Sequence, residues 1–149
     1  MKQLFTLVQQ RLQTIEGLRH IDKDWGQLQR EQPPVRYPCA LVDCEQMDFS
    51  QKGQHVVGVV AEVSVTIADM RMSNTGDTYA IFDLIDATHQ ALHAWSPAPG
   101  YGRLMASGMT KETADYGFEV YRLTFRTAFD IAMPDSQTQV TAQPAVVKG

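Results

Sequence analysis

The sequence predicts an α+β domain in which two helices cover one face of a mainly antiparallel four-stranded sheet. Three features of its 149 residues lead to this prediction. Apolar residues recur at helical spacing in two separate segments, one long segment alternates apolar and more polar residues, and two further strand-like segments follow the second helical one. The expected order is therefore helix, strand, strand, helix, strand, strand.

The first helix is expected over residues 3–16. Its apolar side chains recur every three or four positions: Leu4, Val8, Leu12 and Ile15. Gly17 is the expected stop, because glycine readily takes the left-handed conformation that follows many helices. Residues 19–37 then lack any period, and Pro33 and Pro34 exclude regular helix. A loop of this length in a compact domain is usually functional or bound to a partner.

Two strands joined by a turn are expected next. The first strand covers residues 39–47, the turn 48–53 and the second strand 54–70. In the second strand every other residue is apolar: Val57, Val59, Ala61, Val63, Val65 and Ile67. This strand is longer than most, so part of it is expected to project from the body of the domain.

The second half of the chain repeats the order helix, strand, strand. The helix is expected over residues 78–95, and the strands over 101–111 and 118–131. In the last strand Leu123 and Phe125 are predicted to face the core. The residues that alternate with them face the opposite way, toward solvent or a partner: Arg122, Thr124 and Arg126.

The C-terminal residues differ in composition from the rest. Residues 134–149 contain no aromatic residue and little periodicity, so they are predicted to form a flexible tail. Residues 1–133 remain as a single domain, with the loop 19–37 inside it.

Composition excludes several classes of protein. The formal net charge is −4 and the pI is near 5.5, which argues against a surface that binds nucleic acid throughout. No apolar run approaches the length of a membrane span, and the N-terminus lacks the apolar region of a signal peptide. Cys39 and Cys44 lie too far apart on one strand to form a disulfide, so synthesis in a reducing cytoplasm is expected.

The motifs of enzymes and metal sites are not found in the sequence. It contains no phosphate-binding glycine loop, nucleophile elbow, zinc-protease motif or kinase signature. His89 and His93 could share one helix face, but no further ligand at helical spacing completes a metal site. Asp43 and Glu45 lack a nucleophile or base beside them in the sequence. We therefore expect no catalytic residue, metal or cofactor.

The pattern resembles the tail terminator, or tail completion, proteins of long-tailed bacteriophages, a family that includes the terminator of phage lambda. The resemblance covers about residues 3–132. It rests on the first helix ending in Ile15-Glu16-Gly17-Leu18, the loop residues Trp25-Gly26-Gln27-Leu28, and the proline-led entry to the first strand, Pro33-Pro34-Val35-Arg36-Tyr37-Pro38-Cys39-Ala40-Leu41-Val42. The long alternating strand, the helix residues Ile81-Phe82-Asp83-Leu84-Ile85 and a closing hairpin complete it.

The resemblance implies a structural virion protein. Such proteins assemble, typically as hexameric rings, on the head-proximal end of the tail tube, stop its polymerisation and join it to the head. The expected partners are other copies of the chain, the tail tube protein and a head–tail connector protein, with DNA passing through the lumen without specific binding and no membrane involved. Two alternatives stay open: a tail tube or other head–tail joining subunit, and a small-molecule-binding or enzymatic α+β domain.

Charged residues supply the candidates for the assembly surfaces. A ring closes only through contacts between two unlike patches, and opposite charges favour such contacts. Arg36, Arg122 and Arg126 are the candidate subunit contacts. DNA must slide through a tail without sticking, so the inner wall is expected to be acidic or neutral, and the densest acidic cluster supplies the lumen candidates: Asp43, Glu45 and Asp48.

Overall fold

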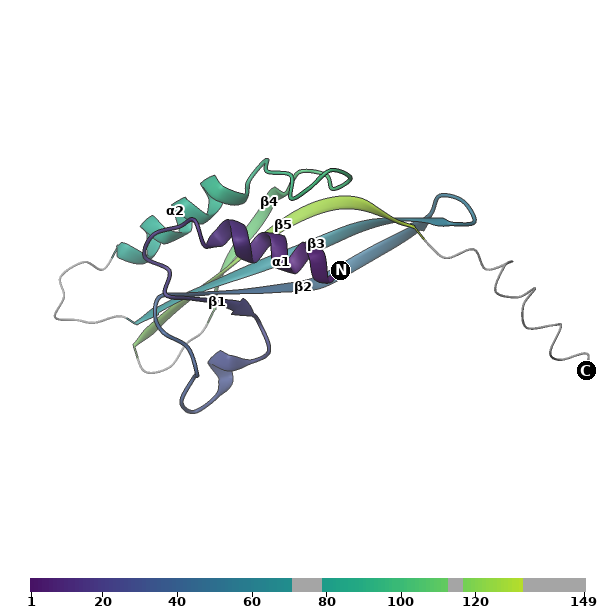
Figure 1. Cartoon of the computed structure of the whole chain (residues 1–149). Helices are drawn as coiled ribbons and strands as arrows, with labels where there is room; N and C mark the ends of the chain where they lie inside the picture. Colours follow the sequence, from purple (N-terminus) through teal and green to yellow (C-terminus); the bar gives the residue numbers. More distant parts are fainter. Residues whose placement is uncertain (71–78, 113–116, 133–149) are drawn as a thin grey trace, which may run out of the picture.

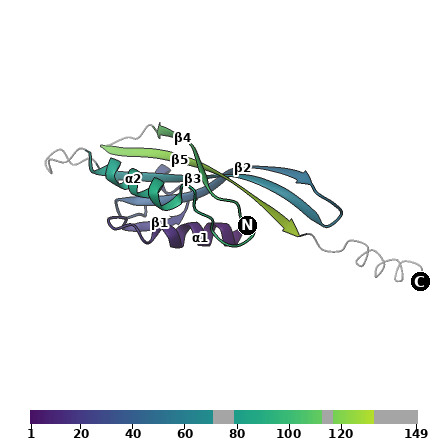
Figure 2. The same ribbon diagram turned by 90° about the horizontal axis from the view of Figure 1, so that it is seen from above.

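The computed structural model of the chain describes residues 1–70, 79–112 and 117–132 (Figure 1). It contains a five-stranded sheet in the order β1-β2-β3-β5-β4, with two helices on one face (Figures 1 and 2). The elements are α1 (Lys2–Leu12), β1 (His20–Lys23), a short 3₁₀ helix η1 (Gln27–Gln29), β2 (Cys39–Gln51), β3 (Val56–Met70), α2 (Ala80–Leu92), β4 (Met105–Glu112) and β5 (Phe118–Ala132). The predicted tail, residues 134–149, lies outside the described residues.

The sheet is mixed and has one strand more than predicted. β1 lies inside the predicted loop 19–37 and pairs in parallel with the start of β2, from His20 opposite Cys39 to Lys23 opposite Val42. The other neighbouring strands pair antiparallel, as expected. β1 escaped prediction because four residues with Ile21 as the one aliphatic side chain are too short to show alternation.

Helix α1 is shorter than predicted and ends at Leu12, five residues before the expected stop at Gly17. Leu4, Val8 and Leu12 are its buried residues. After Leu12 the backbone tightens, because the amides of Thr14 and Ile15 bond to carbonyls three residues back, and the Thr14 hydroxyl donates to the Arg11 carbonyl at 2.7 Å. The Thr14 hydroxyl competes with the Ile15 amide for the Arg11 carbonyl, so the regular helix ends before residue 16.

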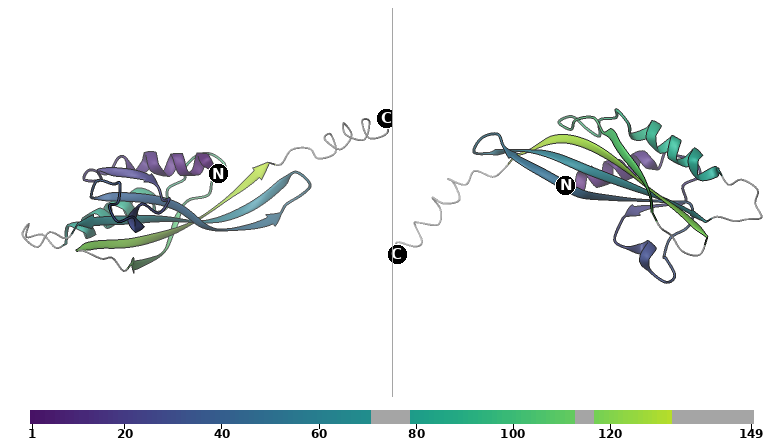
Figure 3. Two further views of the ribbon diagram at one scale, coloured as in Figure 1. Left: turned by 90° about the horizontal axis from the view of Figure 1, so that it is seen from below. Right: turned by 180° about the vertical axis from the view of Figure 1, so that it is seen from behind.

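The hairpin β2–β3 extends well beyond the helices. β2 continues to Gln51, four residues past its predicted end, so the predicted turn 48–53 is largely strand. β2 pairs with both β1 and β3 as far as Val42 and with β3 alone beyond it, and a bulge at Glu45 interrupts the pairing with β3. We call the projecting part the arm; it comprises residues 46–51, 56–60 and 128–132 (Figures 1 and 3). A salt bridge of 3.0 Å from Lys52 to Asp130 ties its tip together.

The second helix and β4 are both shorter than predicted. α2 ends at Leu92 because the following residues turn back to the sheet: the His93 ring accepts a hydrogen bond from the Ala106 amide at 3.0 Å, and Trp95 forms a bridge with Leu104. Tyr101 likewise makes an isolated bridge with Phe129, so β4 begins at Met105 rather than at residue 101. Residue 78, the predicted start of the helix, lies outside the described residues.

Two hydrophobic clusters hold the fold together on opposite faces of the sheet. The larger lies under the helices and includes Leu4, Ile85, Val63 and Phe125, all at most 3% exposed. The smaller lies on the opposite face, where loop side chains cover the start of β2; it comprises Cys39, Leu41, Ala68 and Val120, with Leu28, Val35, Tyr37 and Phe118 against them. The loop predicted to contact a partner therefore also covers part of its own sheet.

The loop is held by a buried glutamine. Gln27 is fully buried, and its side-chain amide donates to the Lys23 carbonyl at 2.8 Å while its oxygen accepts from the Trp25 amide at 2.8 Å. Gly26 has φ +95°, a conformation that favours glycine. These bonds fix the loop and leave the Trp25 ring exposed beside Arg30.

We predict that Phe125→Ala lowers the free energy of unfolding by about 3–5 kcal/mol, because it removes a fully buried ring and leaves a cavity. Phe49→Ala is the matched control: this ring is 63% exposed, and its loss should change the free energy by less than about 0.5 kcal/mol. Chemical denaturation of both variants measures the difference. Equal losses would mean that the faces of the strands are assigned incorrectly.

A second prediction concerns Asp69, which lies directly opposite Glu119 across β3 and β5. Burial, with a contribution from Glu119, raises the pKa of Asp69 above its usual value. The folded state therefore holds this proton more tightly than the unfolded state, so stability decreases as the pH rises through the Asp69 pKa. Asp69→Asn should raise the melting temperature at pH 7 and lose that advantage below pH about 3.8, the ordinary carboxyl pKa. An identical difference at both pH values would contradict the assignment.

Candidate assembly surfaces

The sheet face opposite the helices, here called the far face, carries most of the predicted charged candidates. An ion pair joins Arg122 on β5 to Glu45 at the bulge of β2, and the Arg122 Nε lies 3.1 Å from a carboxylate oxygen of Glu112 on β4. These three side chains extend across the small residues Ser64 and Thr66 of β3, which are nearly fully buried. Arg122 thus links β2 and β4 across this face.

The other two lumen candidates lie on the same face. Asp43 is opposite Ser64, and Asp48 is opposite Val60. Ser64 and Val60 both lie on the face of β3 that points away from the helices. Asp43 is half-buried and accepts a hydrogen bond from the Cys44 amide at 2.9 Å, whereas Asp48 is exposed on the arm. The backbone therefore brings Asp43, Glu45 and Asp48 onto one surface, on the side of the sheet away from α1 and α2 (Figure 2).

The three arginine candidates differ in how far they are available to a partner. Arg122 is about one-third exposed and is held by its two carboxylates. Arg126 is 65% exposed, and its Nε lies 3.9 Å from Glu62. Arg36 is exposed on the loop between Val35 and Tyr37, whose side chains pack inward. Arg126 and Arg36 are therefore the more accessible cations.

The structure corrects one expectation about these charges. The arginines and the acidic residues were expected on two separate patches that would meet between copies. Instead Glu45 and Arg122 form an ion pair within one chain. Alternation from Asp43 already places Glu45 on this face, and the bulge that follows brings Asp48 onto it as well, since Asp48 lies opposite Val60.

The sequence analysis missed an exposed apolar surface on β4 and α2. Met105 and Met109 of β4 are each about half exposed, and nearby Tyr79, Phe82 and Tyr121 stack in sequence, with ring centroids 6.3 and 5.5 Å apart. We call Met109, Tyr79, Phe82 and Tyr121 the aromatic patch. Its signal in the sequence was β4 itself, which lacks the alternation of a half-buried strand and is therefore typical of an edge.

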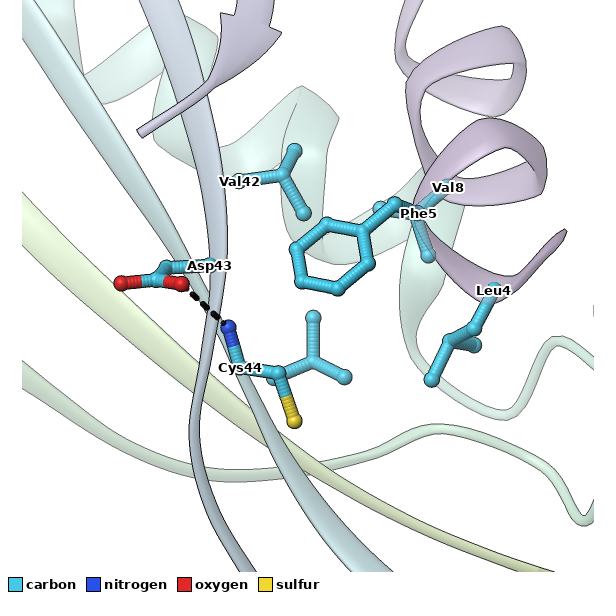
Figure 4. A pocket seen from close by; sticks show the side chains of 7 residues that line it. Leu4, Phe5, Val8, Val42, Asp43 and Cys44 are labelled. Atoms are coloured by element: carbon cyan, nitrogen blue, oxygen red, sulfur yellow. Dashed lines mark hydrogen bonds between the residues drawn. The ribbon is translucent and has the colours of Figure 1, made fainter. Parts of the chain in front are cut away.

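A seam between α1 and β2 forms a small pocket (Figure 4). It is lined by Leu4, Phe5, Val8, Val42, Asp43, Cys44 and Val63. Its empty volume is about 150 Å³ with the solvent at its mouth included, and it has no interior space that would hold a water molecule. In residues 1–70, 79–112 and 117–132, no group of three His, Cys, Asp or Glu side chains is placed to hold a metal ion. Within the same ranges, no helix is long and apolar enough to cross a membrane.

Both cysteines are free thiols, as predicted, and they face opposite sides of the sheet. Burial raises the pKa of Cys39 to about 12. Burial, with the neighbouring Asp43 carboxylate, also raises the pKa of Cys44. Since the thiolate is the reactive form, both side chains are poor nucleophiles at neutral pH.

The described residues thus form a long sheet with charged and apolar surfaces at its edges. Comparison with known proteins gives the family. A family model described as "Phage tail terminator protein" matches residues 4–138, and the chain therefore belongs to the phage tail terminator family. It is a structural protein of the virion tail and not an enzyme, and it interacts with other virion proteins.

A solved structure shares the fold. A chain of the "Virion of native gene transfer agent (GTA) particle" superposes with a TM-score of 0.59 at 14% sequence identity, covering 86% of this chain and 95% of that chain. No curated protein sequence matches the chain.

We predict that Arg122→Gln lowers the free energy of unfolding by about 1 kcal/mol, because it leaves Glu45 and Glu112 without their shared cation. Arg126→Gln, the control at a more exposed site, should cost less than about 0.5 kcal/mol. The loss at Arg122 should shrink in high salt, which screens the pair. Denaturant titrations at low and high salt test this, and equal losses for the two variants would show that Arg122 has no structural role.

Proposed function

We propose that copies of this chain form a ring, hexameric as in the resemblance drawn above, that caps the head-proximal end of the tail tube and joins it to the head. The observation that carries the proposal is the family match over residues 4–138. Residues 1–133 are the ring-forming domain. The partners are further copies of the chain, the tail tube protein and a head–tail connector protein.

The shape of the subunit supports a closed ring. The two sheet edges are different: one ends in β4, and the other is formed by β1 and the arm part of β2. Unlike edges favour head-to-tail contacts, which generate rings when the rotation closes. Like-to-like contacts would instead give dimers.

The far face is the proposed wall of the lumen. Helices cover the other face, and the lumen candidates Asp43, Glu45 and Asp48 lie on this one. Carboxylates outnumber cations on the far face: Asp43, Glu45, Asp48, Glu62, Glu112 and Asp130 against Arg122, Arg126 and Lys52. An acidic wall repels DNA phosphates, so DNA passes without specific binding.

A tail tube subunit, or another head–tail joining subunit, is the alternative within the same class. A tube protein stacks its rings without limit, whereas a terminator adds one ring and stops. The enzymatic or small-molecule-binding alternative conflicts with the family and is set aside.

The test is electron microscopy of particles assembled without this chain. We expect filled heads and separate tubes of uncontrolled length, because tube growth is no longer stopped. Complementation with the wild-type chain should restore joined tails of uniform length. Complete absence of tubes would identify a tube protein instead, and normal joined tails of normal length would refute a role in tail completion.

A further inference from the structure

The outer edge of β4 is open in the described part of the chain. β4 is the last strand in the sheet order, and seven of its eight residues are exposed, from Met105 to Lys111. An exposed strand edge presents unpaired backbone groups that can bind another strand. Beside this edge, on the helix side of the sheet, lies the aromatic patch, in which Met109 is 48% exposed.

The arm part of β2, together with residues 43–45 before it, provides a second open edge. β1 covers β2 from Cys39 to Val42, and in the described residues no strand pairs with the outer side of residues 43–51. Two apolar side chains of the arm face the helix side: Met47, opposite Ala61, and Phe49, opposite Val59. Phe49 is 63% exposed, which is unusual for a phenylalanine in a central hairpin.

The two edges are complementary in charge. Residues 43–51 carry three acidic side chains, Asp43, Glu45 and Asp48, and no basic one. The β4 edge carries Lys111 and has Arg103 and Arg126 close by, against the single acid Glu112. Opposite charge on two unlike edges favours pairing between copies over pairing of an edge with itself.

Strand direction also permits the pairing. β2 and β3, β3 and β5, and β5 and β4 are all antiparallel, so β4 runs opposite to β2 in the same chain. In a ring whose strands run along its axis, rotation about that axis preserves these directions. β4 of one copy and β2 of the next would therefore meet as an antiparallel pair, without inverting a subunit.

The offset between the edges has the sense that a closed ring needs. Through the sheet, Met105 aligns with Gln46 and Glu112 with Cys39, so β4 lies level with residues 39–46 of β2. The open part of β2 is instead 43–51, displaced by about four to five residues, or about 15 Å. A sheet that closes on itself requires such a stagger between its ends.

We infer that the arm of one copy pairs along the β4 edge of the next, with Phe49 and Met47 packed on the neighbour's Met109 and aromatic patch. The occupant of each open edge is a second copy of this chain. This inference rests on the proposed ring and states which surfaces close it. Backbone hydrogen bonds join the strands, apolar contacts form on the helix side, and the charges of Asp48 and Arg126 meet on the far face.

Cross-linking on purified tail tubes tests the pairing in the full-length chain. In a Cys44→Ser background, Ser50→Cys and Thr110→Cys place thiols on the far-face side of the two edges. With a short bismaleimide, mixed rings of the two single variants should give covalent dimers, and the double variant should give a ladder of higher species. Rings of either single variant alone should give none.

A second experiment measures the apolar contact. Phe49→Asp and Met109→Asp should each lower ring occupancy on tubes by about tenfold or more, because each places a carboxylate in an apolar contact. Phe49→Asp combined with Met109→Lys should recover part of the loss. Trp25→Asp, at a ring 50% exposed on the loop, is the matched control and should leave occupancy unchanged. Melting curves should be alike for all of them, since these side chains are exposed.

The outcomes separate this inference from the proposed function. Rings that form on tubes without cross-links in the mixture, or with dimers from one single variant alone, overturn the edge pairing and leave the terminator function in place. Equal occupancy for Phe49→Asp and wild type does the same. If the wild-type chain forms no ring on tubes, the proposed function fails and the edge pairing fails with it.

Discussion

The fifteen-residue pairing of β3 with β5 is the constraint on which the rest of the structure depends. Its strands span about 50 Å, whereas helices of 11 and 13 residues span only about 17–20 Å. Two short helices cannot cover so long a sheet, and the uncovered remainder becomes the arm. The alternation of β3 fixes which face of every neighbouring strand is buried, because β2 and β5 are in register with it on either side. The helices add cover to a sheet whose length is already set by hydrogen bonds.

The elements with a long period could be predicted from the sequence. The alternation of Val57 to Ile67 located β3, and the spacing of Leu4, Val8 and Leu12 located α1. β1 could not be predicted, since its pairing depends on a parallel neighbour that is distant in the chain and leaves no local pattern. The ends of α1 and α2 were also missed by a few residues. The end of α1 is set by Thr14, whose hydroxyl bonds to a helix carbonyl, and the end of α2 by His93, whose ring bonds to the Ala106 amide of β4.

The family and the nature of the surface could be predicted better than its arrangement. Arg122, Glu45 and Asp48 were identified from charge and strand position, and all lie on the face that helices leave open. Their mutual geometry depends on the bulge at Glu45, a single inserted residue that alternation does not reveal. The aromatic patch was missed for a related reason: it joins α2, β4 and β5, so its members are scattered in sequence and each resembles an ordinary core residue.

The two hydrophobic clusters pack on opposite faces of the same end of the sheet. Cys39, Leu41 and Ala68 are fully buried on one face there, and Ala40 and Ile67 on the other. Among the described residues, the opposite end is not packed on both faces in this way. The end of the sheet near the helices and the loop is therefore the stiffer part. The strands of the arm are held chiefly by their own hydrogen bonds. The arm is the part that deforms most easily, since regions with few buried contacts open at the lowest free energy. This difference in stiffness lets the arm adjust to neighbouring subunits of slightly different geometry while the rest of the domain keeps its shape.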